Sequence, residues 1–116
     1  MSSGALLRSQ RDPLFGFSAA ELQQWLASRL AGRVSEAHLF GSVGTNDFGP
    51  SSDVDLMIVV DTGLPFVERG SLFDDLRDRV PSLEILVYTP DEFRRLTSDP
   101  SPGFWRTVVP TLRRIV

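Results

Sequence analysis

The chain of 116 residues contains no cysteine and no lysine. The lack of cysteine excludes disulfide bonds, thiolate nucleophiles and zinc–thiolate sites. The lack of lysine excludes a phosphate-binding lysine of the Walker type and Schiff-base chemistry, and all twelve basic residues are arginines. The side chains left for chemistry are therefore carboxylates, hydroxyls, arginines and a single histidine.

Long apolar segments are also missing. No run approaches the roughly 20 residues that a membrane-spanning helix needs, and the N-terminus has no apolar signal region, so we expect a cytoplasmic protein without membrane contact. The net charge of −3 argues against a large binding surface for duplex nucleic acid. With 41% hydrophobic residues, the chain is expected to form one domain with a modest core.

Two short motifs point to a particular chemistry. Gly41-Ser42 is followed, after ten residues, by Asp53-Val54-Asp55-Leu56. In a strand, Asp53 and Asp55 project from the same face roughly 7 Å apart along the backbone, while Val54 and Leu56 face a core. Two acids on one face repel each other and lose hydration unless a cation neutralises them. Oxygen ligands alone favour Mg²⁺ or Mn²⁺ over zinc.

The periodicity of the chain predicts an α/β (α+β) fold, a small mixed β-sheet with helices packed on one face. Residues 1–17 are predicted to be a flexible leader, and residues 18–116 the domain. A capping box at Ser18 and Glu21 begins the first helix, and Gly32 ends it. The other predicted elements, in order, are a strand over 34–40, a loop over 43–52, a strand over 53–60, a helix over 66–80, a strand over 83–88, helices over 90–96 and 104–109, and an edge strand or packed segment over 112–116.

The segment from Phe40-Gly41-Ser42 through Ser52-Asp53-Val54-Asp55-Leu56 resembles the signature of the DNA polymerase beta-like nucleotidyltransferases. Within that superfamily, the chain length is similar to that of the minimal nucleotidyltransferases, small proteins often encoded beside a helical toxin partner. The resemblance implies a palm-like core over residues 18–116. It also implies a third acid on the next strand, which would be Glu84. From the residues alone, Glu84 is equally well interpreted as an edge-strand charge that faces water.

The resemblance further implies a mechanism. Asp53, Asp55 and Glu84 would be the catalytic residues and would hold two Mg²⁺ ions, with Mn²⁺ as the alternative metal. Gly41, Ser42 and Ser52 would bind the nucleotide, ATP or another NTP. A nucleoside monophosphate, AMP in the case of ATP, would then pass to a hydroxyl, such as a side chain of a partner toxin.

Alternatives to catalysis remain open. Relatives often have a basic residue directly after Gly-Ser, and this chain has Val43 there. Triphosphate affinity would then be weaker, or an arginine from elsewhere would supply the charge. The protein could be an inactive antitoxin that neutralises a helical toxin by binding it, or a sensor that binds nucleotide without turnover. A core this short is expected to need a partner protein or self-association to complete its site. The single histidine, His38, is interpreted as a packing residue.

Overall fold

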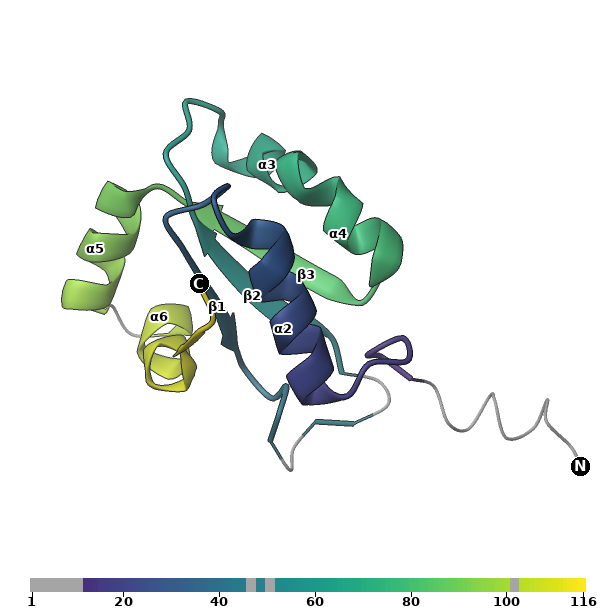
Figure 1. Ribbon diagram of the computed structural model, residues 1–116. Helices are drawn as coiled ribbons and strands as arrows, with labels where there is room; N and C mark the ends of the chain where they lie inside the picture. Colours follow the sequence, from purple (N-terminus) through teal and green to yellow (C-terminus); the bar gives the residue numbers. More distant parts are fainter. Residues whose placement is uncertain (1–11, 46–47, 50–51, 101–102) are drawn as a thin grey trace, which may run out of the picture.

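The computed structural model describes residues 12–45, 48–49, 52–100 and 103–116, which form a mixed sheet flanked by helices (Figure 1). The predicted α/β class is confirmed. The elements, in chain order, are α2 (Ala19–Leu30), β1 (Glu36–Phe40), β2 (Val54–Val59), α3 (Phe66–Arg69), the 3₁₀ helix η1 (Gly70–Phe73), α4 (Asp74–Arg79), β3 (Leu83–Tyr88), α5 (Pro90–Ser98), α6 (Phe104–Val108), the 3₁₀ helix η2 (Val109–Thr111) and β4 (Arg113–Arg114).

The strands lie in the order β3-β2-β1-β4. β1 pairs antiparallel with both β2 and β4, whereas β2 and β3 are parallel and are joined by the segment that contains α3 and α4. A parallel pair requires such a crossover connection, because the chain must return to the same end of the sheet. The last segment, left open between an edge strand and simple packing, forms the short edge strand β4.

One face of the sheet is covered by α2, η1 and α4 (Figure 1). α2 begins at the predicted capping box, in which Ser18 and Glu21 each bond the other's backbone N–H. Its leucines are fully buried against the sheet, as expected for apolar residues that recur at helical spacing. The fully buried leucines of α2 are Leu22, Leu26 and Leu30.

The opposite face is partly covered by α5 and α6. The prediction that the helices pack on one face is therefore correct for the helices that precede β3 and wrong for α5 and α6. Phe93 of α5 and Trp105 of α6 pack on a second apolar cluster built around Phe40 and Met57. This packing follows from strand alternation, because Phe40 and Met57 point away from the α2 side. Asp55 and Glu84 lie at the end of this face where β1 contributes Phe40, and the candidate site lies there.

The domain begins earlier than predicted. Residues 1–11 lie outside the described residues, but residues 12–17, assigned to the leader, pack against the domain. Leu14 and Phe17 contact the main core, and the Phe17 ring lies 5.6 Å from that of Trp25. The guanidinium of Arg79 lies 4.3 Å from the Phe17 ring centre. Apolar contacts and a cation–π contact thus hold a segment that has no helical or strand period of its own.

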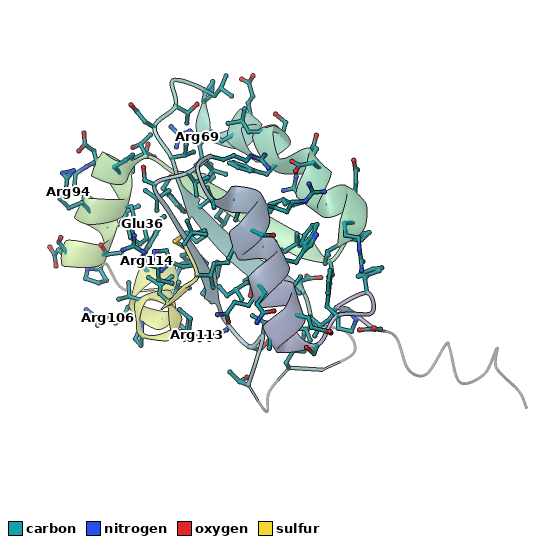
Figure 2. The ribbon with its side chains drawn as sticks, in the orientation of Figure 1. Glu36, Arg69, Arg94, Arg106, Arg113 and Arg114 are labelled. Atoms are coloured by element: carbon teal, nitrogen blue, oxygen red, sulfur yellow. The ribbon has the colours of Figure 1, made fainter. Side chains whose placement is uncertain are left out.

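The predicted helix over 66–80 is broken into α3, η1 and α4. Arg69, at the end of α3, is only 7% exposed (Figure 2). Its guanidinium donates to the carbonyl oxygens of Leu64, at 2.8 Å, and Val87, at 3.3 Å, and to the carboxylate of Glu92, at 2.6 Å. Gly70 follows directly, and glycine has a low helix propensity. The glycine together with the buried arginine explains why the helix is interrupted here.

Glu92→Gln is expected to lower the free energy of unfolding at neutral pH by about 2 kcal/mol, because it leaves Arg69 buried without its counter-charge. The hydrogen bond from Arg69, followed by the backbone N–H of Thr89, lowers the pKa of Glu92 to about 2. A depressed pKa stabilises the folded state above the unfolded value, and this contribution is lost as the pH falls through the folded one. The difference between wild type and variant should therefore shrink below about pH 4.5 and nearly vanish at about pH 2.

Urea unfolding at stepped pH measures this difference. Thr89 and Glu92 form the capping box that begins α5. Glutamine at position 92 can still accept a hydrogen bond from the backbone N–H of Thr89, so the variant removes the charge and keeps the cap. Glu21→Gln is the matched control, since Glu21 has the same position in the capping box of α2. An equal loss at every pH would show that packing, and not the ion pair, stabilises this joint.

Within the part of the chain that the structure describes, no helix has both the length and the apolar character that crossing a membrane requires.

Candidate active site

The predicted carboxylates lie together on the open end of the sheet face that α5 and α6 partly cover. Asp55 in β2 is the register partner of Glu84 in β3. Side chains of paired positions share a face, and neighbouring strands lie about 4.8 Å apart. Asp53 precedes β2 by one residue and is two positions from Asp55, so it projects to the same side. Val54 and Leu56 between and after them are fully buried on the other face, as predicted.

The three carboxylates influence one another. Burial, and then the negative charges of Glu84 and Asp53, raise the pKa of Asp55 above its ordinary value. Asp53 and Glu84 are exposed, whereas Asp55 is half-buried. The ionised form of Asp55 is therefore destabilised by its surroundings, which is the situation that a bound cation would relieve.

The Gly-Ser turn lies directly against Asp55. Gly41 has a φ of +73°, which favours glycine. A Cβ at this position would lie 2.5 Å from Oδ2 of Asp55, a distance that no side chain can adopt without displacing the carboxylate. The absence of a side chain at Gly41 thus lets the carboxylate and the turn meet, and the structure brings the two sequence motifs into contact.

The two serines of the prediction have separate roles in the structure. Ser42 continues the turn, and its carbonyl oxygen accepts hydrogen bonds from the backbone N–H of Thr45, at 3.0 Å, and from the Thr45 hydroxyl, at 2.6 Å. The Ser52 hydroxyl accepts the backbone N–H of Gly49 at 3.1 Å, which shapes the loop before β2. Ser42 therefore lies next to the contact between Gly41 and Asp55, whereas Ser52 supports the entry to the strand.

A divalent metal fits this set of residues by chemistry. The three donors are carboxylates, the ligands that Mg²⁺ and Mn²⁺ favour, and the pKa of Asp55 is raised by burial and then by the charges of the other two. Among residues 12–45, 48–49, 52–100 and 103–116, no three acidic, histidine or cysteine side chains are grouped as a metal site.

The sequence model of the family described as "Nucleotidyltransferase domain" matches residues 21–109. The chain belongs to this family. The match includes both motifs and the strand that carries Glu84. Membership supports nucleotidyl transfer as the general activity of the domain. Neither a curated protein nor a solved structure matches the chain.

Two residues near the end of the nucleotidyltransferase domain hold the Gly-Ser turn in place, and the sequence analysis did not find them. The backbone N–H of Gly41 donates to Oγ1 of Thr111 at 3.1 Å. The guanidinium of Arg113 donates to the carbonyl oxygen of Val43 and, at 3.2 Å, to that of Thr111. The sequence analysis left open whether an arginine from elsewhere would supply charge near Val43, and the position of Arg113 in β4 had no local signal. We call Thr111 and Arg113 the turn clamp.

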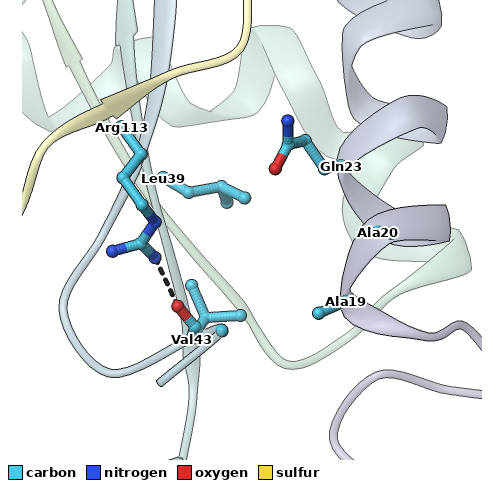
Figure 3. Close-up of a pocket in the computed structure, with 7 residues that line it drawn as sticks. Ala19, Ala20, Gln23, Leu39, Val43 and Arg113 are labelled. Carbon is cyan, nitrogen blue, oxygen red and sulfur yellow. Dashed lines mark hydrogen bonds between the residues drawn. The ribbon is translucent and has the colours of Figure 1, made fainter.

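The pocket beside Arg113 lies on the α2 side of the sheet (Figure 3). Its volume is about 290 Å³, and its lining residues are Ala19, Ala20, Gln23, Leu39, Val43, Gly44 and Arg113. Another hollow, of about 430 Å³, lies at the start of α5 and is lined by Asp61, Thr89, Pro90 and Asp91. Neither hollow includes a predicted site residue. The location of the candidate active site follows from the motifs and the register.

Thr111→Val should weaken nucleotide binding about fivefold, because the Gly41 N–H loses its acceptor while the side chain keeps its shape. Isothermal titration with Mg²⁺ and ATP measures the affinity. Thr107→Val is the matched control, since the hydroxyls of Thr111 and Thr107 both donate to a backbone carbonyl, that of Val108 at 2.7 Å and that of Gly103 at 3.1 Å, and Thr107 lies outside the turn clamp. Equal affinities for Thr111→Val and wild type would show that the turn keeps its shape without the clamp.

The only histidine has a packing role. His38 is 8% exposed, and its ring stacks on Phe93 with the centres 5.2 Å apart. Its Nε2 lies 3.0 Å from the Glu36 carboxylate, while Nδ1 is buried and has no hydrogen-bond partner among the described residues. These contacts agree with the interpretation of His38 as a packing residue.

Proposed function

We propose that the domain transfers a nucleoside monophosphate, AMP from ATP in the first instance, to a hydroxyl group, with Mg²⁺ as its cofactor. The position of Asp55 carries this proposal. Asp55 is the register partner of Glu84 and shares a face of the sheet with Asp53. Its carboxylate lies against Gly41 of the turn. A nucleotidyltransferase needs anionic ligands for metal and a close backbone turn for phosphate at the same place, and these residues supply both.

Asp53, Asp55 and Glu84 would hold the metal. Bound Mg²⁺ would offset the charge of the triphosphate and lower the pKa of the acceptor hydroxyl. Manganese has the same ligand preference and is the natural substitute in assays.

The chain's own residues orient the nucleotide and receive the proton. Gly41 lets the backbone approach phosphate closely, and the Ser42 hydroxyl can donate a hydrogen bond to a phosphate oxygen. A bond forms between the acceptor oxygen and the α-phosphorus, the bond from that phosphorus to the β-phosphate oxygen breaks, and pyrophosphate leaves. Glu84 is exposed and can take the acceptor proton or pass it to water.

The acceptor is proposed to be a side-chain hydroxyl of a partner protein. Asp53 and Glu84 are exposed, so a docked partner would exclude water from the carboxylates more completely than this domain does alone. Arginines of α5 and α6 lie on the side of the molecule that these two helices form (Figure 2), where they favour a partner with an acidic surface. The labelled arginines of these helices are Arg94 and Arg106.

A second candidate function is neutralisation of a partner protein by binding alone. It is favoured by the exposure of Asp53 and Glu84, which are not grouped for metal in the described residues. Co-expression with the partner separates the two functions. A pure binder keeps its protection in an Asp53→Asn/Asp55→Asn double variant, whereas a modifying enzyme loses it.

The proposed function is tested by calorimetric titration of ATP into the protein, first with Mg²⁺ and then with EDTA. We expect binding only with the metal. Transfer of label from ATP labelled at the α-phosphate to a partner protein then identifies the acceptor. ATP binding of equal strength in EDTA, or none in either condition, would contradict the proposal.

A further inference from the structure

Phe104 is an aromatic residue that the folded domain leaves exposed. It is the first residue of α6 and is 48% exposed. A single exposed apolar residue is normal on a protein surface and requires no explanation. The position of Phe104 relative to the carboxylates is what makes it informative.

The Phe104 ring is fixed by two other rings. It meets Phe40 edge to face, with the ring centres 6.2 Å apart and an angle of 86° between the planes. It meets Trp105 at 5.7 Å and 82°. Edge-to-face contacts of this kind are favourable and restrict how a ring can lie. Phe104 is therefore a supported ring with free surface.

The same contact links Phe104 to the carboxylates. Phe40 in β1 is the register partner of Asp55 in β2, and Asp55 is the partner of Glu84 in β3. Because paired residues share a face of the sheet, Phe40, Asp55 and Glu84 form a row across it. Phe104 lies on the Phe40 end of that row. Phe40 thus lies between the exposed Phe104 ring and the carboxylates of Asp55 and Glu84.

We infer that Phe104 is the stacking platform for the base of the nucleotide, and that the domain therefore prefers purine over pyrimidine nucleotides. This inference rests on the proposed function. With the phosphates held by the turn and the carboxylates, the sugar connects them to a base that lies on the Phe104 side of the row. Aromatic stacking binds any base, and it strengthens with the size of the stacked ring system. Phe104 would act through contact with the base and not with the reacting atoms.

The test compares Phe104→Ala with wild type by calorimetric titration of ATP, CTP and inorganic tripolyphosphate in Mg²⁺. Phe104→Ala should weaken ATP binding about tenfold, a change in the range reported for loss of one base stack. Tripolyphosphate has no base, so its affinity should not change. Phe104→Trp should restore ATP binding. Trp105, which contacts Phe104, should change its fluorescence when ATP binds but not when tripolyphosphate binds.

Phe66→Ala is the matched control. Phe66 is 45% exposed and also packs on another aromatic ring, that of Tyr88, but it belongs to α3. It should leave every affinity unchanged. Equal losses for ATP and tripolyphosphate in Phe104→Ala, or no loss for ATP, would overturn the stacking role alone. If wild-type protein binds neither ATP nor tripolyphosphate, the proposed function fails and the stacking role with it.

Discussion

Asp55→Asn should lower nucleotidyl transfer at least about 10³-fold and should raise the melting temperature of the metal-free protein. The loss of activity follows because Asp55 is the register partner of Glu84 and its carboxylate lies against Gly41 of the turn. The gain in stability follows because burial and two like charges raise the pKa of Asp55, so its ionised form is unfavourable in the folded state. Activity and stability are thus expected to change in opposite directions.

The pH dependence gives the same prediction a second measurement. Since the folded pKa of Asp55 lies above its value of 3.8 in the unfolded chain, wild type loses stability relative to Asp55→Asn as the pH rises from 3.8 through the folded pKa. Added Mg²⁺ should reverse the order. At 100 times its dissociation constant, a ligand stabilises the protein that binds it by about 2.7 kcal/mol, and the variant should gain far less.

Calorimetric melting with and without Mg²⁺, together with labelled transfer, measures both effects. Asp78→Asn on α4 is the control, because Asp78 is an exposed acid on a helix that covers the other face of the sheet. A destabilised Asp55→Asn protein, or one that retains transfer, would mean that Asp55 is a structural residue.

Gly41→Ala should reduce transfer about 10²-fold, because the new methyl group would displace the Asp55 carboxylate. It should also cost about 1 kcal/mol of stability, since alanine is strained at a φ of +73°. The activity loss should disappear in an Asp55→Asn background, in which the displaced group no longer serves catalysis.

Gly32→Ala is a closely matched control. Gly32 has a φ of +80°, and a Cβ there meets nothing within 4 Å. Gly32→Ala should therefore introduce the same backbone strain as Gly41→Ala and retain its transfer activity. If both variants lost transfer equally, the contact between Gly41 and Asp55 would have no role beyond folding.

Local chemistry predicted much of this structure. The capping box that begins α2 forms as expected and a second one begins α5, because the hydrogen bonds of such a box involve residues only three apart. Strand alternation correctly separated Asp53 and Asp55 from Val54 and Leu56. The same rule assigned Glu84 to one face of its strand. The pairing of Glu84 with Asp55 could not be predicted in this way, because it depends on the register of the two strands in the folded sheet.

What could not be predicted depends on residues distant in sequence. The break after α3 occurs where Arg69 is drawn to Val87 and Glu92, which lie on other elements. The packing of residues 12–17 depends on contacts with Trp25 and Arg79. The segment has no hydrophobic periodicity from which these contacts could be predicted. In each case, contacts with residues distant in sequence outweigh the local structural preference of the segment.

The turn clamp sets the order in which this protein can assemble. Gly41 and Thr111 are 70 residues apart in the sequence, as are Val43 and Arg113. Contacts of such separation carry a large loop-closure entropy and form late in folding. On the ribosome, β1, β2 and α2 can emerge and associate while the Gly41-Ser42 turn still lacks its two supports. We therefore expect the core to form first and the turn to acquire its final shape only after residue 113 has been synthesised and β4 has paired with β1.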